Sequence, residues 1–180
     1  MNKLIYIIRH CKAEGQSPHA SLTDEGFRQA EEVAQFFDEI PIDEIISSPY
    51  ERAIQTISRC ASTKNLDVKI DERLSERILS SISLDDWMDK LQETYMDLDL
   101  NFEGGESSKE AMLRIVAVIK DIAVSPHKNT IIVTHGNIMS LLFNYYDKNF
   151  GFAEWKQLSN PDIYLLKMSE EAVQYKRVWV

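Results

Sequence analysis

The sequence has few cysteines, glycines and prolines and no long hydrophobic run. Its two cysteines, Cys11 and Cys60, lie far apart and form neither a disulfide framework nor a metal-type pair, which predicts a reducing, cytoplasmic location. Six glycines and five prolines in 180 residues argue against linker-like or low-complexity segments. The apolar run after Lys3 has five residues, too short for a signal peptide or a membrane helix, so we expect no membrane association.

Positive charge is also scarce. Twenty Lys and Arg residues stand against 29 Asp and Glu residues, which gives a net charge of -9 at pH 7. Such a chain lacks the basic surface that binds nucleic acid or an anionic membrane regardless of sequence, so we expect no nucleic-acid partner. An anionic substrate would need a local basic site.

The composition is that of a folded protein, with 44% hydrophobic and 27% charged residues. A chain of this length can bury roughly 70% of the surface that it exposes when unfolded, so its core needs no disulfide or metal. We expect residues 1–180 to form a single domain. The oligomeric state is not indicated by the sequence.

Strand-length apolar stretches alternate with amphipathic helical patterns along the chain. The stretch 4–11 has the pattern of a buried strand that stops at Arg9-His10, and residues 163–168 and 173–180 predict a terminal hairpin. This alternation predicts a three-layer α/β/α sandwich with a mainly parallel sheet and an antiparallel edge. The other expected strands are 42–46, 66–70 and 130–133, and the expected helices are 23–40, 49–61, 84–96, 107–123 and 138–146.

Polar residues follow several of these strands. In an open α/β sheet, ligands bind in the crevice outside the carboxyl ends of the strands. We therefore expect four polar segments to meet in one crevice. They are Arg9-His10, 47–52, 72–76 and Thr134-His135.

These side chains together suit phosphoryl transfer. A neutral imidazole at His10 could attack phosphorus and form a phosphohistidine. Arg9, Arg52 and His135 could donate hydrogen bonds to the phosphoryl oxygens. Glu76 could protonate the leaving oxygen and then accept a proton from water. Each residue also has a structural interpretation: Arg52 and Glu76 as solvated surface charges, and His135 as a helix cap.

Five segments, in this order, resemble the motifs of the histidine phosphatase superfamily, the phosphoglycerate mutase-like family. The resemblance spans residues 4 to about 142, and its most specific part is 47–56. The segments are Arg9-His10-Cys11 with Glu14-Gly15, Leu22-Thr23-Asp24-Glu25-Gly26, Ser47-Ser48-Pro49-Tyr50-Glu51-Arg52-Ala53-Ile54-Gln55-Thr56, Arg73-Leu74-Ser75-Glu76 and Thr134-His135-Gly136.

The resemblance implies a role for each candidate residue. His10 would be the phosphorylated nucleophile and Glu76 the proton donor. Arg9, Arg52 and His135 would form the phosphate pocket. The resemblance also implies a three-layer α/β/α fold, no cofactor and no metal.

The chain departs from the family's pattern in several places. Cys11 stands where the family usually has Gly, and we expect a small buried hydrophobic residue there rather than a redox-sensitive thiol. Gln16 occupies the place of an Asn that touches phosphate in many members. Residues 77–81 lack a glycine-containing signature, and the short stretch 16–23 lacks the extra loop that phosphoglycerate mutases place around their substrate.

The short rim favours hydrolysis, because a mutase must keep water from its phosphorylated intermediate. We expect a metal-independent phosphatase of the histidine acid phosphatase type, acting on small phosphomonoesters. Three alternatives stay open. They are mutase-type phosphoryl transfer, a weakly active regulatory domain that binds phosphate, and a metal site between His10, Cys11 and His135.

The sequence does not identify the substrate. Loops and helices around a rigid sheet usually carry specificity, so we expect residues 84–123 and the loop after Gly15 to form the rim of the site. Trp87, Tyr95 and Phe102 are candidates to line it, although aromatic residues at such spacings are more often part of a core.

Overall fold

A computed structural model describes residues 2–179, and six strands are present in that part of the chain. They are β1 (Lys3–Arg9), β2 (Glu44–Ser47), β3 (Val68–Ile70), β4 (Asn129–Thr134), β5 (Asp162–Met168) and β6 (Val173–Arg177). They form one sheet in the order β3-β2-β4-β1-β5-β6. The first four strands in this order pair in parallel, whereas β5 runs antiparallel to both β1 and β6. The expected antiparallel edge is therefore confirmed.

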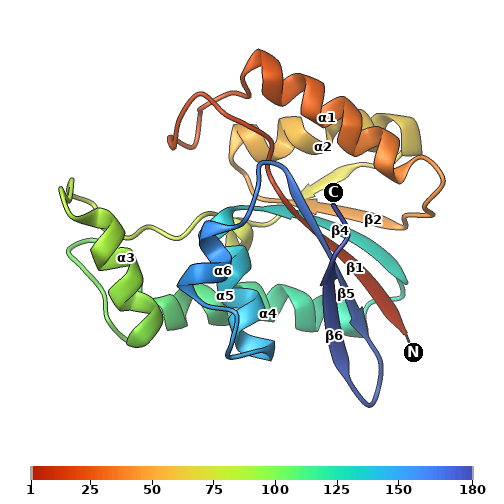
Figure 1. Ribbon diagram of the computed structural model, residues 1–180. Coiled ribbons are helices and arrows are strands. Elements are labelled where there is room, and N and C mark those ends of the chain that lie inside the picture. Colours follow the sequence, from red (N-terminus) through yellow and green to blue (C-terminus); the bar gives the residue numbers. More distant parts are fainter. Residues whose placement is uncertain (1, 180) are drawn as a thin grey trace.

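Helices cover both faces of the sheet (Figure 1). They are α1 (Asp24–Phe37), α2 (Glu51–Lys64), α3 (Trp87–Met96), α4 (Ser108–Val124), α5 (Gly136–Tyr146) and α6 (Phe152–Lys156), with a 3₁₀ turn, η1 (Glu72–Leu74). The helices α1 and α2 lie on one face, and α4 and α5 lie on the other. The three-layer α/β/α architecture is thus as predicted. In residues 2–179, no helix is both long enough and apolar enough to cross a membrane.

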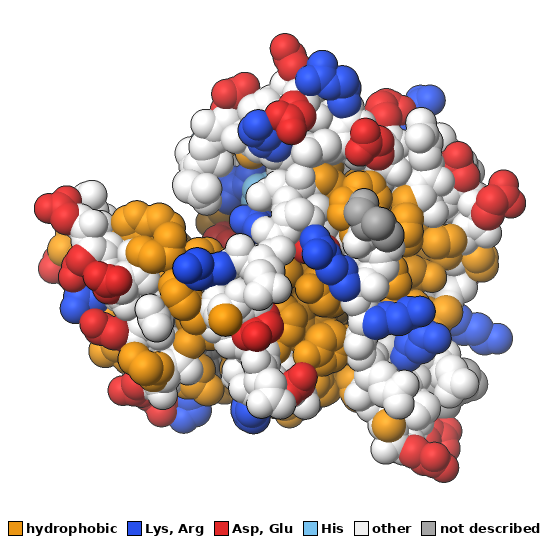
Figure 2. Space-filling view, viewed as in Figure 1, with side chains coloured by type: hydrophobic (Ala, Val, Ile, Leu, Met, Phe, Trp, Pro, Cys, Tyr) orange, Lys and Arg blue, Asp and Glu red, His pale blue; other side chains and the backbone are white. Residues whose placement is uncertain are grey.

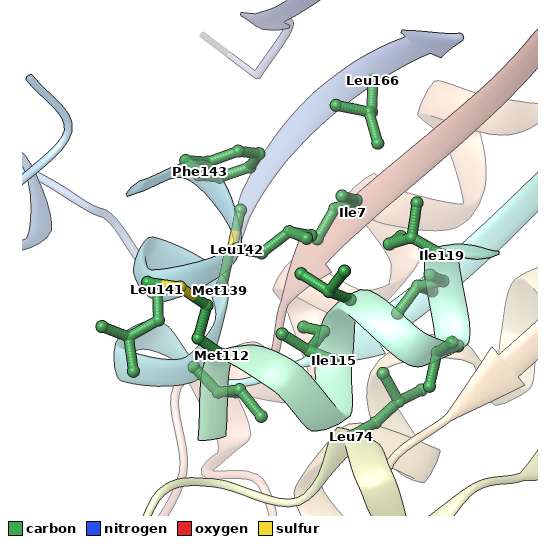
Figure 3. Packing of buried hydrophobic residues seen from close by; sticks show 14 of the residues in the cluster. Ile7, Leu74, Met112, Ile115, Ile119, Met139, Leu141, Leu142, Phe143 and Leu166 are labelled. Carbon is green, nitrogen blue, oxygen red and sulfur yellow. The ribbon is translucent and has the colours of Figure 1, made fainter. Parts of the chain in front are cut away.

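Strand β1 is buried on both faces, which explains its continuous apolar sequence. Ile5 and Ile7 pack into the layer that contains α4 and α5. Tyr6 and Ile8 pack into the layer that contains α1 and α2, because successive side chains point to opposite faces of a strand. Figure 3 shows side chains of α4 and α5 pointing toward one another around Ile7. The end of β1 is therefore held between two packed layers.

Several boundaries differ from those expected. Thr23 caps α1 as predicted, and its side chain accepts a hydrogen bond from the Gly26 N–H. Pro49 was expected in the first turn of the second helix. The helix α2 instead begins at Glu51, and Tyr50 before it has an extended backbone. The short helix α6 was not expected, and Val180, the last residue of the expected hairpin, lies outside the described residues.

Candidate active site

The carboxyl ends of the central strands bring the candidate residues together. Arg9 at the end of β1 is in register with Thr134 at the end of β4, so the histidines that follow them are neighbours. The ring centroids of His10 and His135 are 5.1 Å apart. Ser47 at the end of β2 pairs with Val133, and Arg52 follows in the first turn of α2. The predicted meeting of polar segments at the strand ends is therefore present.

The imidazole of His10 is held in one tautomer. Its Nδ1 lies 2.7 Å from the carbonyl oxygen of Cys11. A carbonyl oxygen only accepts, so Nδ1 carries the hydrogen and Nε2 keeps its lone pair. Arg52 Nε donates to this nitrogen at 3.2 Å. Burial lowers the pKa of His10 to about 3, and the charges of Arg52 and Arg9 act in the same direction, so the ring is neutral near pH 7.

Arg9 is a half-buried cation that has hydrogen-bond donors without a partner among the described residues. Its Nη1 donates to the carbonyl oxygen of Leu158 at 2.9 Å. Its Nε is buried and has no hydrogen-bond partner within residues 2–179. The close approach of this guanidinium to α5 requires a glycine, because a Cβ atom at Gly136 would lie 2.9 Å from Nε and 3.0 Å from Cζ.

Arg52 is 1% exposed. The structural interpretation of Arg52 as a solvated surface charge is therefore wrong. Its Nη1 donates to the carbonyl oxygens of Ser17, at 2.8 Å, and Gln16, at 3.2 Å. These bonds hold the short loop after β1 against α2. Gln16 lines the same cavity as Arg52, and contact between its side chain and phosphate stays a prediction.

His135 stands at the N-cap position of α5, but its side chain makes no capping hydrogen bond. Its Nε2 lies 2.7 Å from Ser48 Oγ, which already accepts a hydrogen bond from the Tyr50 N–H. The Ser48 hydroxyl is therefore free to donate to Nε2, which favours a hydrogen on Nδ1. This Nδ1 is buried and has no partner in the described part of the chain. Burial, together with the nearby His10 and Arg52, lowers the pKa of His135 well below its usual value.

Glu76 joins the η1 loop to the N-terminus of α5. Its Oε1 accepts the N–H groups of Ile138, at 3.0 Å, and Arg77, at 2.9 Å. Its Oε2 accepts the Asn137 N–H, at 3.1 Å, and no other donor among residues 2–179, so it has a further lone pair available. The carboxylate lines the cavity beside Arg9 and Arg52. Glu76 is therefore a helix cap that faces the basic groups, whereas its role as proton donor stays a prediction.

Some supporting residues carry no signal in the local sequence. Arg114 of α4 donates to the carbonyl oxygens of Arg73 and Ser75, at 2.7 and 2.8 Å, and so fixes the loop that bears Glu76. Asn160 donates to the carbonyl oxygen of His10 at 2.7 Å, across 150 positions of the chain. Such contacts depend on the tertiary fold, and no motif or periodicity points to them.

Cys11 is fully buried, as expected for a small hydrophobic residue at this position. Its N–H donates to Thr56 Oγ1 at 2.9 Å, and burial raises the pKa of its thiol to about 12. The sulfur is therefore protonated near pH 7, which disfavours a redox-sensitive thiolate. Cys11 and Cys60 are both free.

A cavity of about 880 Å³ opens above the basic groups. Arg9, Arg52, Glu76 and Asn137 are among its lining residues, and Figure 2 shows basic and histidine side chains inside the hollow. Its rim includes residues 16–18 and part of 84–123, as predicted. Trp87 lines the cavity. Tyr95 and Phe102 are not among its lining residues.

The sequence model of the histidine phosphatase superfamily (branch 1) matches residues 5–179. The chain belongs to this superfamily. The match covers the strand ends, the loop that bears Glu76 and the terminal hairpin, so the resemblance seen in the first 142 residues extends through nearly the whole chain.

Relatives of this histidine phosphatase include both phosphatases and a mutase. Phosphoserine phosphatase 1 of Hydrogenobacter thermophilus is 26% identical over 148 residues, which cover 74% of this chain and 70% of the relative. Probable phosphoglycerate mutase GpmB of Proteus mirabilis is 29% identical over 157 residues, which cover 78% and 73%. A complex of mycobacterial glucosyl-3-phosphoglycerate phosphatase with inorganic phosphate has the same fold, with a TM-score of 0.78 and 22% identity over 98% of this chain and 96% of that one. Family membership thus leaves hydrolysis and mutase chemistry to be distinguished.

The metal alternative lacks a suitable set of ligands. Among residues 2–179, no three His, Cys, Asp or Glu side chains are grouped so that they could hold a metal ion. The Cys11 thiol is buried, and burial raises its pKa to about 12. His10, Cys11 and His135 therefore do not fit a metal site.

Proposed function

We propose that this histidine phosphatase hydrolyses small phosphomonoesters through a phosphohistidine formed at Nε2 of His10. The observation that carries the proposal is the Nδ1 bond to the Cys11 carbonyl, which leaves the Nε2 lone pair free on a neutral ring. Arg9, Arg52 and His135 surround that ring with donors for the phosphoryl oxygens.

In the first step, Nε2 attacks phosphorus, the Nε2–P bond forms and the bond from phosphorus to the ester oxygen breaks. Glu76 donates a proton from Oε2 to the leaving oxygen, so that an alcohol departs. The Arg52 Nε–H, which donates to Nε2 in the structure, then donates to a phosphoryl oxygen instead.

In the second step, water attacks phosphorus while the Glu76 carboxylate accepts a proton from it. The Nε2–P bond breaks, inorganic phosphate leaves, and His10 returns to its neutral form. No redox partner is consumed.

The same proposal includes independence of metal ions, so incubation with a strong chelator should leave the rate of hydrolysis unchanged. The two free, buried cysteines support a reducing, cytoplasmic location.

The rim supports hydrolysis over mutase chemistry. On the side of the loop after β1, only three consecutive residues, 16–18, line the cavity. With so small a contribution from this loop, we expect the phosphohistidine to stay open to water, which then competes with a second acceptor alcohol. Phosphate release should therefore exceed phosphoglycerate interconversion by a wide margin. Efficient interconversion would instead identify a mutase.

The experiment that tests the nucleophile combines substitution with trapping. His10→Ala should lower the rate of hydrolysis of 4-nitrophenyl phosphate at least about a thousandfold, because the covalent route is lost. Rapid acid-free quenching with radioactive substrate should trap base-stable, acid-labile phosphate on the wild-type protein and none on the variant.

A histidine remote from the cavity provides the matched control. His127 precedes β4 and makes a side-chain contact with Glu44. His127→Ala should keep both the rate and the trapped phosphate. Retention of activity in His10→Ala would remove His10 from the mechanism. If the wild-type protein instead binds phosphate tightly but has low activity on all phosphomonoesters, the regulatory-domain alternative would be favoured.

A further inference from the structure

The cavity is basic at one end and apolar along its outer side. The apolar side chains come from residues 78–84, from α3 and from α6. We call them the apolar wall; its members are Ile78, Leu79, Ile82, Leu84, Trp87, Leu91 and Trp155. In Figure 2, hydrophobic side chains gather on the α3 side of the hollow, facing the basic groups. A phosphomonoester bound at the basic end would direct its leaving group along this wall.

Much of the apolar wall is exposed. Ile78 is 52% exposed, Ile82 49% and Trp87 48%. Single exposed hydrophobic residues are ordinary on a protein surface, but these three line the same cavity. A ligand that covers them removes apolar surface from water. The cavity itself thus favours an apolar leaving group.

The two tryptophans of the wall differ in their surroundings. Trp87 lies in the first turn of α3, one turn before Leu91, which is buried. Trp155 stacks on Phe152, with ring centroids 5.4 Å apart and planes at 24°. The Trp155 ring is therefore held by a neighbour and needs little reorganisation to receive a ligand.

Charges near the wall do not favour an anionic leaving group. Arg77 lines the cavity but is 5% exposed, and its Nε and Nη1 donate to the Glu106 carbonyl oxygen and to Thr94 Oγ1. Its Nη2 is buried and has no hydrogen-bond partner among residues 2–179. The aliphatic side chains of the wall offer no partner for a charged group. The wall therefore disfavours a second carboxylate or phosphate.

We infer that the leaving group of the substrate is aromatic, so that the protein acts on aryl phosphates. The phosphate lies against Arg9 and Arg52, and the ring lies against Trp87 and Trp155. A flat ring beside two indoles buries apolar area and gains aromatic contacts that an aliphatic chain does not. This inference rests on the proposed function, because it takes the phosphate position from it.

Phosphonates test the inference without bond cleavage, so the reactivity of the leaving group does not enter. Calorimetry would compare inorganic phosphate, methylphosphonate, benzylphosphonate and 3-phosphonopropionate on the wild-type protein. Benzylphosphonate should bind at least about tenfold more tightly than methylphosphonate, the gain expected for burying one aromatic ring. The carboxylate compound should bind no more tightly than methylphosphonate.

Two neighbouring substitutions on α3 locate the effect. Trp87→Ala should reduce the preference for benzylphosphonate over methylphosphonate at least about threefold, because the ring of the ligand then contacts one tryptophan instead of two. Met88→Ala is the matched control, since Met88 is exposed on the same turn of α3 but does not line the cavity. It should keep the wild-type preference, and both variants should bind methylphosphonate equally well.

The outcomes separate this inference from the proposed function. Equal binding of benzylphosphonate and methylphosphonate, tighter binding of 3-phosphonopropionate, or an unchanged preference in Trp87→Ala would each overturn the aryl leaving group while leaving the phosphatase proposal intact. Failure of inorganic phosphate to bind the wild-type protein would contradict the phosphate site itself.

Discussion

Single residues of the site are controlled largely by burial. His10 and His135 both have lowered pKa values because they are buried beside cationic groups. A histidine in the unfolded chain has a pKa near about 6.5. Between that value and the lower folded value, the unfolded state binds more protons than the folded state. Each histidine therefore destabilises the fold as the pH falls below about 6.5, and has no such effect above it.

This linkage predicts a pH-dependent stability. The free energy of unfolding should fall between pH 6.5 and 5.5 by about 1 kcal/mol for each of the two histidines. Urea unfolding at pH 7.5, 6.5 and 5.5 measures it. His10→Gln should show a shallower fall, because one of the two contributions is removed. An equal pH dependence in the wild type and in His10→Gln would show that folding does not lower the pKa of His10.

Glu76 has two roles in the proposal, and one substitution separates them. Glu76→Gln keeps an oxygen that can accept N–H bonds at the N-terminus of α5 but carries no acidic proton. Hydrolysis of alkyl phosphates should fall by about 10² to 10⁴, since an alkoxide leaves poorly without a proton. Formation of the phosphohistidine from 4-nitrophenyl phosphate, measured as a burst of nitrophenolate, should fall much less, because this leaving group is already stable as an anion. The steady-state rate should still fall, because water needs Glu76 as its base in the second step.

The control for this test is the exposed Glu72 of η1, two residues after the end of β3. Glu72→Gln should leave both rates unchanged. Equal losses in the rate of phosphohistidine formation from alkyl and nitrophenyl substrates in Glu76→Gln would show that Glu76 does not protonate the leaving oxygen and instead positions α5.

Among the elements, the start of α5 lies close to Arg9, one of the residues proposed to bind phosphate. A methyl group at Gly136 would lie 2.9 Å from Arg9 Nε, and Arg9 has little room to move because this nitrogen is buried and the side chain is bonded to Leu158. Gly136→Ala should therefore displace the guanidinium and lower kcat/KM by about 10- to 100-fold. Helix propensity alone would favour alanine, so a loss of activity with unchanged or higher Tm would locate the effect in Arg9.

Gly151 offers a matched glycine outside the cavity. A Cβ atom there would meet its nearest neighbour, Glu154 Oε2, at an ordinary 3.7 Å. Gly151→Ala should keep full activity. Wild-type kcat/KM in Gly136→Ala would mean that Arg9 is able to shift without loss of phosphate binding.

The elements differ in how far their sequences predict them. The strands β1 and β4 are predictable because each is a continuous apolar run that ends at a polar pair. The same local pattern predicts that His10 and His135 lie at the site, since each directly follows such a run. Helix α6 was missed because its five residues are too few for a periodic pattern, and none of them is fully buried. Its Trp155 nevertheless lines the cavity.

Across the whole molecule, contacts between distant segments complete the site. The segment before β5 contacts both Arg9 and His10, through Leu158 and Asn160. Arg114 of α4 fixes the loop that carries Glu76. None of these contacts is encoded in a local spacing, because each depends on how the layers pack. The sequence thus predicts the nucleophile and its charged neighbours, whereas the residues that position them require the fold.

The core and the site occupy different parts of this architecture, so stability and activity should respond separately. Ile119 of α4 is fully buried in the layer with α5, whereas Leu113 of the same helix is 54% exposed. Ile119→Ala should lower the free energy of unfolding by about 2–5 kcal/mol through the cavity that it leaves. Leu113→Ala should change it by less than about 0.5 kcal/mol. Denaturant unfolding measures both changes.

The kcat/KM of the folded variants at 25 °C should stay within about twofold of the wild type, because the strand ends are held from both faces of the sheet. A large loss of kcat/KM in Ile119→Ala while the protein remains folded would show instead that α4 packing sets the geometry at Glu76, through Arg114.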